Sequence, residues 1–233
     1  MAEAPKRLAL IPARGGSKRL PGKNVRAFGG RPMIVWSIEH AFQSGLFDAI
    51  VVSSEDEGIG RTAEQAGAKW ARRPSKLATD RVEVDAVCLD YLKREAEAGR
   101  DWDILSILYA TAPLRAVDDI VQVVGAVEGG GADFAMTVTR YPYSPFGALE
   151  VDEEGNAHLL WPDLALRSRQ DLPTVRTDVG STYAARVQAY LEVGNLYGPN
   201  LKVVEVPAER GVDIDTADDV ALAEFYLARM GAR

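Results

Sequence analysis

The stretch that decides the fold is LALIPARGGSKRLPGKN, which runs from Leu8 to Asn24. Its first residues, Leu8–Ile11, are all apolar, as expected for a buried strand, and the chain then enters a loop in which glycines alternate with cations. Backbone N–H groups can approach a ligand closely at glycines, and cations supply positive charge at the same place. The small, polar and charged residues of this loop are Arg14, Gly15, Gly16, Ser17, Lys18, Arg19, Gly22, Lys23 and Asn24.

A helix is expected soon after this loop, because Pro32 lies just ahead of an amphipathic segment that begins at Met33. A strand, a cationic glycine-rich loop and a helix together form an anion-binding arrangement, and a polyphosphate is the anion that suits the charge of the loop. The alternative interpretation is a solvated basic turn. Phosphate binding is favoured because four cations lie between Arg14 and Lys23, directly after a buried strand.

Two better-known phosphate-binding loops do not fit this sequence. A P-loop requires GxxxxGK[ST], but Gly22 is preceded five residues earlier by Ser17, and Asn24 stands where Ser or Thr is needed. A dinucleotide fingerprint requires GxGxxG, which the stretch from Gly15 to Arg19 cannot supply.

The charge of the chain is unevenly distributed. Residues 1–31 contain eight lysines and arginines against one acidic residue, Glu3, so this segment carries a charge of +7. The whole chain of 233 residues carries −7, so residues 32–233 carry −14. An acidic protein with one local basic loop suits a small anionic ligand, whereas a nucleic-acid backbone favours an extended basic face. Nucleic acid is therefore not an expected partner.

Composition narrows the class further. An apolar content of 47% in 233 residues fits one large α/β domain. Cys88 is the only cysteine, which excludes an intrachain disulfide and a cysteine metal cluster, and we expect it to be a small buried hydrophobe. Two histidines, His40 and His158, offer little material for zinc chemistry. Met1–Lys6 does not resemble a signal peptide and no apolar run approaches about 18 residues, so we expect a cytoplasmic protein without a membrane span.

Short apolar runs alternate with segments of helical periodicity along the chain. This alternation predicts an α/β fold, a mostly parallel sheet with helices on both faces. The expected strands are Arg7–Ala13, Ala49–Ser53, Asp103–Tyr109, Asp133–Thr139 and Lys202–Val206. The expected helices are Pro32–Ser44, Glu57–Gly67, Val82–Glu97, Val117–Glu128 and Ala217–Met230.

One stretch, Tyr141–Asp178, interrupts this alternation and is rich in proline and aromatic residues. A structureless loop of this length is rare inside a compact domain, so we expect an inserted subdomain or an oligomerisation arm. Its core would be a hairpin over Ala148–Trp161 with a turn at Asp152–Asn156.

Two aspartates near the end of the sequence, Asp213 and Asp215, are candidate metal ligands. In an extended chain, residues two apart face the same side, and paired carboxylates suit Mg²⁺ when phosphates complete its coordination shell. The alternative is helix capping, in which Thr216 and Asp219 form a capping box. Capping gives no reason for Asp213, and the residues alone leave both interpretations open.

The segment YATAPLR, from Tyr109 to Arg115, follows a strongly apolar strand. Ligands of open α/β sheets bind beyond the carboxyl ends of the strands, where Thr111 and Arg115 could reach them. The alternative is an ordinary strand-to-helix turn with a solvated Arg115. Arg73 and Arg169 add guanidinium groups, which bind phosphate and carboxylate bidentately.

Taken in order, the motifs IPARGGSKRLPGKN, RRPSKL, TAPLR, RQDLP and DIDT resemble the acylneuraminate cytidylyltransferases, also called CMP-sialic acid synthetases. The resemblance spans nearly the whole chain. It implies a three-layer nucleotidyltransferase fold, with residues 1–233 as a single domain and residues 141–178 as an inserted dimerisation element. It also implies a homodimer that uses CTP and Mg²⁺ to activate a nine-carbon 2-keto sugar acid, with release of pyrophosphate.

The resemblance assigns roles to individual residues. Asp213 and Asp215 would hold Mg²⁺, and Asp215 would favour deprotonation of the attacking sugar hydroxyl, while Arg14 and Lys23 would neutralise charge on the triphosphate. The nucleotide-binding set would be Arg14, Gly15, Gly16, Ser17, Lys23, Asn24 and Arg73, and the sugar-binding set would be Tyr109, Thr111, Arg115 and Arg169.

The sequence departs from the sialic-acid pattern at several positions. Tyr109 and Ala112 replace a common Gln and Ser, and Val84 stands where a serine often contacts the nucleotide. YATAPL and RSRQDLP are closer to the pseudaminic acid branch, whereas Gly180–Tyr183 lacks the GQFYW-like pattern of that branch. Sialic, legionaminic and pseudaminic acids all stay candidates. The alternatives are a 3-deoxy-manno-octulosonate cytidylyltransferase, a DxD glycosyltransferase and a catalytically silent nucleotide-binding module.

Overall fold

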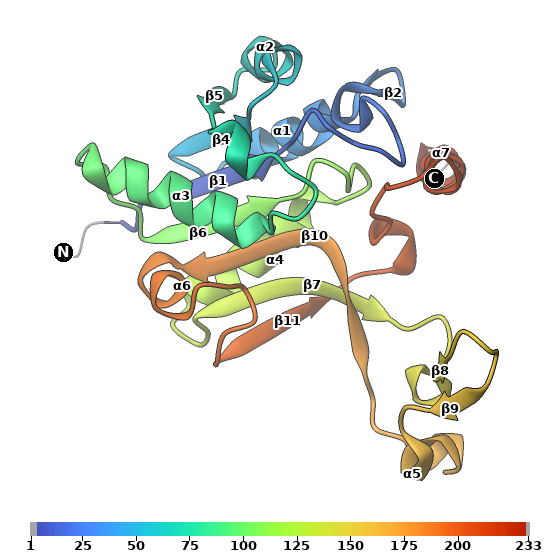
Figure 1. The fold of residues 1–233 in the computed structure, drawn as a ribbon. Helices are drawn as coiled ribbons and strands as arrows, with labels where there is room; N and C mark the ends of the chain where they lie inside the picture. Colours follow the sequence, from blue (N-terminus) through green and yellow to red (C-terminus); the bar gives the residue numbers. More distant parts are fainter. Residues whose placement is uncertain (1–3, 232–233) are drawn as a thin grey trace.

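A computed structural model describes residues 4–231, which form a twisted seven-stranded sheet with helices on both faces (Figure 1). The strand order is β11-β7-β10-β6-β1-β4-β5. In chain order these strands are β1 (Arg7–Pro12), β4 (Ala49–Ser54), β5 (Lys69–Arg72), β6 (Ile104–Leu108), β7 (Phe134–Arg140), β10 (Arg176–Arg186) and β11 (Leu201–Glu205). All neighbouring pairs are parallel except those of β10, which runs antiparallel to both β6 and β7.

The central strands are buried on both faces, which explains their nearly continuous apolar sequences. Successive side chains alternate between two core clusters: Ala9 and Ile11 pack on one face, and Leu8 and Leu10 pack on the other. The first face is covered by α1 (Met33–Ser44), α2 (Glu57–Gln65) and α4 (Val117–Glu128), and the second by α3 (Val84–Glu97) and α6 (Val187–Val193). Cys88 is fully buried in the second cluster, as expected.

A third cluster connects the glycine-rich loop to the C-terminal helix α7 (Ala217–Gly231). Leu20 and Phe28 pack there with Ile214 and Ala223, near the short pair β2 (Ala27–Phe28) and β3 (Arg31–Pro32). The apolar residues between the cations therefore hold the loop against the segment that contains the two aspartates.

The predicted fold class is confirmed, and the predicted strands and helices are present with ends shifted by at most two residues. Among the strands of the seven-stranded sheet and the helices that cover it, the sequence interpretation missed β5, β10 and α6. Among these, β10 matters most, because it lies between β6 and β7 and is the antiparallel member of the sheet. Its pairing is irregular between Asp178 and Tyr183, where Gly180 adopts a positive φ of 59°.

The segment after β7 projects from the body of the molecule (Figure 1). It contains the predicted hairpin, formed by β8 (Leu149–Val151) and β9 (Ala157–Leu159), and then the short helix α5 (Pro162–Ala165). The Asp152 carboxylate accepts hydrogen bonds from the backbone N–H groups of Glu154 and Asn156, which fixes the turn. The predicted boundary at residue 178 lies inside the sheet, because β10 already begins at Arg176. We call residues 141–175 the projecting arm.

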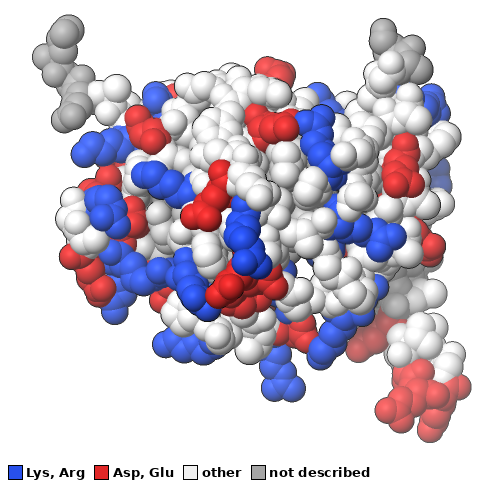
Figure 2. Space-filling model, turned by 90° about the horizontal axis from the view of Figure 1, so that it is seen from above, with Lys and Arg blue, Asp and Glu red and all other residues white. Residues whose placement is uncertain are grey.

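Within residues 4–231, no helix is both long enough and apolar enough to cross a membrane. Met1–Lys6, the stretch expected to lack a leader signal, lies partly outside the described residues. Positive and negative side chains are interleaved on the face shown in Figure 2.

Candidate active site

A cavity of about 220 Å³ lies at the carboxyl ends of β1 and β6. This is where ligands are expected in an open α/β sheet. Eight of the predicted site residues line it: Arg14, Lys23, Asn24, Arg73, Tyr109, Thr111, Asp213 and Asp215. Four segments distant in sequence thus contribute to one cavity, and the RQDLP motif is absent from its lining.

The glycine-rich loop is held in shape by its own backbone and by Asn24. The amide of this buried side chain donates a 2.9 Å hydrogen bond to the carbonyl oxygen of Arg14 and so ties the two ends of the loop together. Gly22 has a positive φ of 66°, a conformation that favours glycine, at the point where the loop turns into the 3-10 helix Lys23–Val25.

The four cations of the loop converge on two carboxylates. Arg14 and Lys18 both pair with Asp80, with the Lys18 Nζ 2.6 Å from Oδ2. Lys23 and Arg19 pair with Asp215: Nζ of Lys23 lies 2.6 Å from Oδ1. Asp80 lies just before α3 and was not selected from the sequence, since a single aspartate in a polar loop gives no signal of its own.

Glu55, at the end of β4, joins the loop to the arginine of the RRPSKL motif. Its Oε1 accepts a 2.7 Å hydrogen bond from the backbone N–H of Gly15, and its Oε2 lies 3.0 Å from Nη2 of Arg73. A Cβ on Gly15 would lie 2.7 Å from a carboxylate oxygen of Asp56, so this position has no room for a side chain. Glu55 positions Gly15 and Arg73 and was also missed by the sequence interpretation.

Asp213 is the most electrostatically perturbed acid in the cavity. Burial raises its pKa to about 6, although a hydrogen bond from Thr111 works in the opposite direction. Its Oδ1 is buried and has no hydrogen-bond partner among residues 4–231. The backbone N–H of Ile214 donates a 2.9 Å hydrogen bond to the Thr111 carbonyl, which fixes Asp213 beside the end of β6.

Asp215 has the opposite environment. Burial works to raise its pKa, but the hydrogen bond from Lys23 and the charges of Lys23 and Arg19 outweigh it and hold the pKa below its usual value. The two carboxylates therefore differ in environment: that of Asp213 is desolvated by burial, and that of Asp215 is paired with cations.

The capping interpretation is correct for the residues that follow. The Asp219 carboxylate accepts hydrogen bonds from the backbone N–H and the hydroxyl of Thr216, both at 2.8 Å, and from the backbone N–H of Asp215 at 3.0 Å. The side chains of Asp213 and Asp215 take no part in this cap. Capping and a carboxylate pair facing the cavity are thus two features of one segment.

Five predicted site residues lie elsewhere in the structure. Gly15, Gly16 and Ser17 are in the loop but do not line the cavity, and Arg169 lies on the projecting arm in the 3-10 helix Arg169–Asp171. Arg115 was predicted either to reach a ligand or to be solvated, and both interpretations are wrong. Its side chain neither lines this cavity nor faces solvent.

The Arg115 side chain is only 2% exposed and ties the end of β6 to its neighbours. It donates to the hydroxyls of Ser37 and Thr182 at 2.9 and 2.7 Å, and to the carbonyl oxygens of Tyr109 and Ser181 at 2.9 and 2.6 Å. Arg115 therefore holds the loop that carries Thr111 and does not reach into the cavity.

Residues 8–159 match the family described as cytidylyltransferase. The chain belongs to the cytidylyltransferase family. It is 34% identical over 222 residues to pseudaminic acid cytidylyltransferase of Campylobacter jejuni, an alignment that covers 94% of this chain and 95% of that protein. It is 33% identical to CMP-N,N'-diacetyllegionaminic acid synthase of Legionella pneumophila, over 93% of this chain and 94% of the relative.

The fold of this cytidylyltransferase is also found among solved structures. A CMP:2-keto-3-deoxy-manno-octonic acid synthetase complexed with CTP superposes with a TM-score of 0.72, over 97% of this chain and 99% of that one, at 20% identity. The resemblance to acylneuraminate cytidylyltransferases is confirmed, since N-acylneuraminate cytidylyltransferase A of Danio rerio is also 31% identical over 96% of this chain and 51% of its own length.

Proposed function

We propose that this cytidylyltransferase is a CMP-nonulosonate synthetase, which transfers the cytidylyl group of CTP to a nine-carbon 2-keto sugar acid. The observation that carries the proposal is the cavity itself, which is lined by Lys23 and Arg14 together with Asp213 and Asp215, with Lys23 paired directly with Asp215. The relatives named for pseudaminic and legionaminic acids align over nearly their whole length, which supports this class of sugar.

In the proposed reaction the anomeric hydroxyl oxygen of the sugar attacks the α-phosphorus of CTP. A new phosphorus–oxygen bond forms, the bond to the bridging oxygen of the β-phosphate breaks, pyrophosphate leaves, and the hydroxyl proton passes to solvent. Arg14 and Lys23 would neutralise the charge of the triphosphate, while Asn24 holds the loop that carries them. The protein acts mainly by positioning the two reactants and stabilising charge.

A divalent cation fits this site chemically. Asp213 offers a buried carboxylate oxygen without a hydrogen-bond partner among residues 4–231, and hard oxygen ligands are those that Mg²⁺ prefers. No cluster of three or more His, Cys, Asp or Glu able to hold a metal occurs in the described part of the chain, so substrate phosphates would complete the shell. Asp213 and Asp215 would hold Mg²⁺, which when bound would offset negative charge on the phosphates and favour loss of the hydroxyl proton.

We propose further that the protein is a cytoplasmic homodimer joined through the projecting arm. The arm exposes large apolar side chains, with Tyr143 86% and Leu166 84% exposed, which a second copy would cover. Arg169 would then contribute to the candidate active site of the neighbouring subunit.

Light scattering at micromolar concentration tests the dimer. We expect Leu166→Glu to weaken the dimer, whereas Leu191→Glu, at an exposed position on α6, should leave it unchanged. A monomeric wild type would contradict this part. The cytoplasm is proposed because the proposed reaction uses CTP, a nucleotide that cells hold in that compartment.

A substrate panel tests the proposed function. CTP would be mixed with sialic, legionaminic, pseudaminic and 3-deoxy-manno-octulosonic acids, and pyrophosphate release would be measured for each. We expect release with at least one of the three nonulosonic acids. Release with 3-deoxy-manno-octulosonate alone would favour the alternative cytidylyltransferase, and release with none would overturn the assignment.

A further inference from the structure

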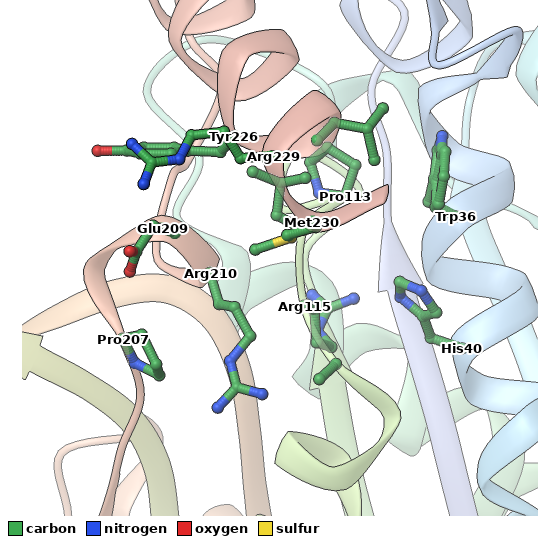
Figure 3. Close-up of a pocket in the computed structure, with 13 residues that line it drawn as sticks. Trp36, His40, Pro113, Arg115, Pro207, Glu209, Arg210, Tyr226, Arg229 and Met230 are labelled. Carbon is green, nitrogen blue, oxygen red and sulfur yellow. The ribbon is translucent and has the colours of Figure 1, made fainter. Parts of the chain in front are cut away.

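A second and larger cavity has a volume of about 500 Å³. It is lined by α1, the loop after β6, the 3-10 helix Ala208–Arg210 and α7, and it opens to solvent (Figure 3). Its lining shares no residue with the cavity that contains Lys23 and Asp215. A volume of about 300–1,000 Å³ is typical of small-molecule pockets.

The walls of this cavity combine aromatic side chains with arginines. Figure 3 shows Trp36 on α1 and Tyr226 on α7 on opposite sides, with the Arg115 side chain between them, below Met230. Three arginines line the cavity, Arg115, Arg210 and Arg229, and one acidic residue, Glu209. The lining therefore carries a net positive charge beside an apolar surface.

Arg115 is the unusual member of this lining, because its buried guanidinium has only neutral hydrogen-bond partners. No carboxylate between residues 4 and 231 forms an ion pair with it, although the charge of Asp119, which pairs with Arg210, raises the Arg115 pKa. Burial lowers its pKa to about 10, which still leaves it charged at neutral pH. The charge of the Asp119 carboxylate, which pairs with Arg210, compensates this buried cation only in part, and an anion in the cavity would add to that compensation.

Other polar groups around the cavity are also incompletely satisfied. His40 Nδ1 and Arg210 Nε are buried without a hydrogen-bond partner in the described part of the chain, although Arg210 Nη2 lies 3.3 Å from Asp119 Oδ1. Burial, together with the charges of Arg115 and Arg31, lowers the pKa of His40 to about 4. The imidazole is thus neutral at pH 7, and the field around it is positive.

We propose that this cavity binds a small organic carboxylate with an apolar or aromatic body. The carboxylate would lie near the arginines, and the body would pack between Trp36 and Tyr226. Such a ligand would touch both segments that lead to the active site, because the loop of Arg115 also carries Thr111 and the segment after Arg210 leads to Asp213.

The binding can be followed at Trp36, whose indole N–H donates a 3.0 Å hydrogen bond to the Phe28 carbonyl. The probe is 3-phenylpropionate, with 3-phenylpropanol as its neutral counterpart, and the Trp36 indole resonance is assigned with Trp36→Phe. We expect a saturable shift with the acid and affinity for the alcohol lower by about tenfold or more. The shift should persist in Lys23→Ala, which alters only the other cavity.

Two neighbouring substitutions of opposite charge provide the decisive comparison. Arg210→Gln should weaken binding of the acid by about fivefold or more, whereas Glu209→Gln should leave it unchanged or tighten it. If Arg210→Gln lowers the melting temperature, Arg229→Gln replaces it in the comparison, because Arg229 is an exposed arginine on α7 that also lines the cavity. No saturable shift up to about 10 mM, equal binding of acid and alcohol, or equal effects of both charge changes would overturn the proposal.

Discussion

The ammonium group of Lys23 lies 2.6 Å from Oδ1 of Asp215, which joins the glycine-rich loop directly to the C-terminal aspartate segment. Arg19 approaches the other oxygen of the same carboxylate. These groups are separated by almost 200 positions in the sequence, as the 192-residue spacing of the Lys23 hydrogen bond shows. The proposed nucleotide site and the proposed metal site therefore meet at this contact.

Removal of the loop cations should weaken nucleotide binding. Lys23→Ala and Arg14→Ala should each raise the Kd for CTP, measured by calorimetry, by about tenfold or more, because each deletes a charge-assisted phosphate contact. Arg26→Ala, at an exposed position beyond the loop, is the matched control. Wild-type affinity in both loop variants would exclude this loop as the phosphate site.

Asp80 should compete with the nucleotide for Arg14 and Lys18. Its pKa is held below the usual value by the hydrogen bonds from Lys18 and Arg14, so it stays charged at neutral pH and occupies both cations. Asp80→Asn should therefore lower the Kd for CTP, by about threefold given that exposed pairs are weak. Asp90→Asn, which breaks an ion pair on α3, is the control. Weaker CTP binding in Asp80→Asn would mean that Asp80 assists the nucleotide.

Asp215→Asn should separate the metal role from the capping role. It retains the shape of the side chain but loses a formal charge, and we expect turnover to fall by about a hundredfold or more with little change in melting temperature. Thr216→Ala should instead destabilise the last helix by about 1 kcal/mol, since it removes the hydroxyl of the cap. Both variants would be measured with and without excess Mg²⁺. Turnover at the wild-type rate in Asp215→Asn would show that this carboxylate has a structural role and does not hold the metal.

Asp213 should make the metal-free protein more stable in mild acid. Its pKa is raised from 3.8 to about 6, so the folded state binds a proton more tightly than the unfolded state. The associated stability is fully present below about pH 4 and is lost as pH rises through about 6. Asp213→Asn should therefore raise the free energy of unfolding at pH 8, by no more than about 3 kcal/mol, and have little effect near pH 4. Chemical denaturation in EDTA measures the free energy of unfolding of both proteins. A stabilisation by Asp213→Asn that is the same at pH 4 and pH 8 would contradict the prediction.

Local sequence predicted much of this fold because its strands are short apolar runs with helices between them. Leu8–Ile11 and Ile104–Leu108 are buried on both faces of the sheet, so their sequences are nearly continuous apolar runs that are easily recognised as strands. Strand β10 was missed for the opposite reason. It mixes Thr, Asp, Gly and Ser with apolar residues, and its place between β6 and β7 is set by pairing across the sheet, which local propensity does not report.

Residues of the candidate site were predicted where the sequence contains a recognisable motif. Lys23, Asp213 and Thr111 each belong to such a motif, and all three line the same cavity. Arg115 lies in the same motif as Thr111, but its direction depends on Ser37 and Ser181, which only the folded structure brings near. Glu55 and Asp80 were missed because their role is to pair with cations from another part of the chain.

The most direct test of the central claim is ³¹P NMR of CTP with the purified protein, Mg²⁺ and each nonulosonic acid in turn. With a suitable sugar acid, the triphosphate signals should be replaced by those of pyrophosphate and a single phosphodiester, and Asp215→Asn should slow this change by about a hundredfold or more. In the absence of the sugar, CTP should persist. Conversion of CTP to a phosphomonoester without any sugar, or no change with all three acids, would contradict the proposed cytidylyl transfer.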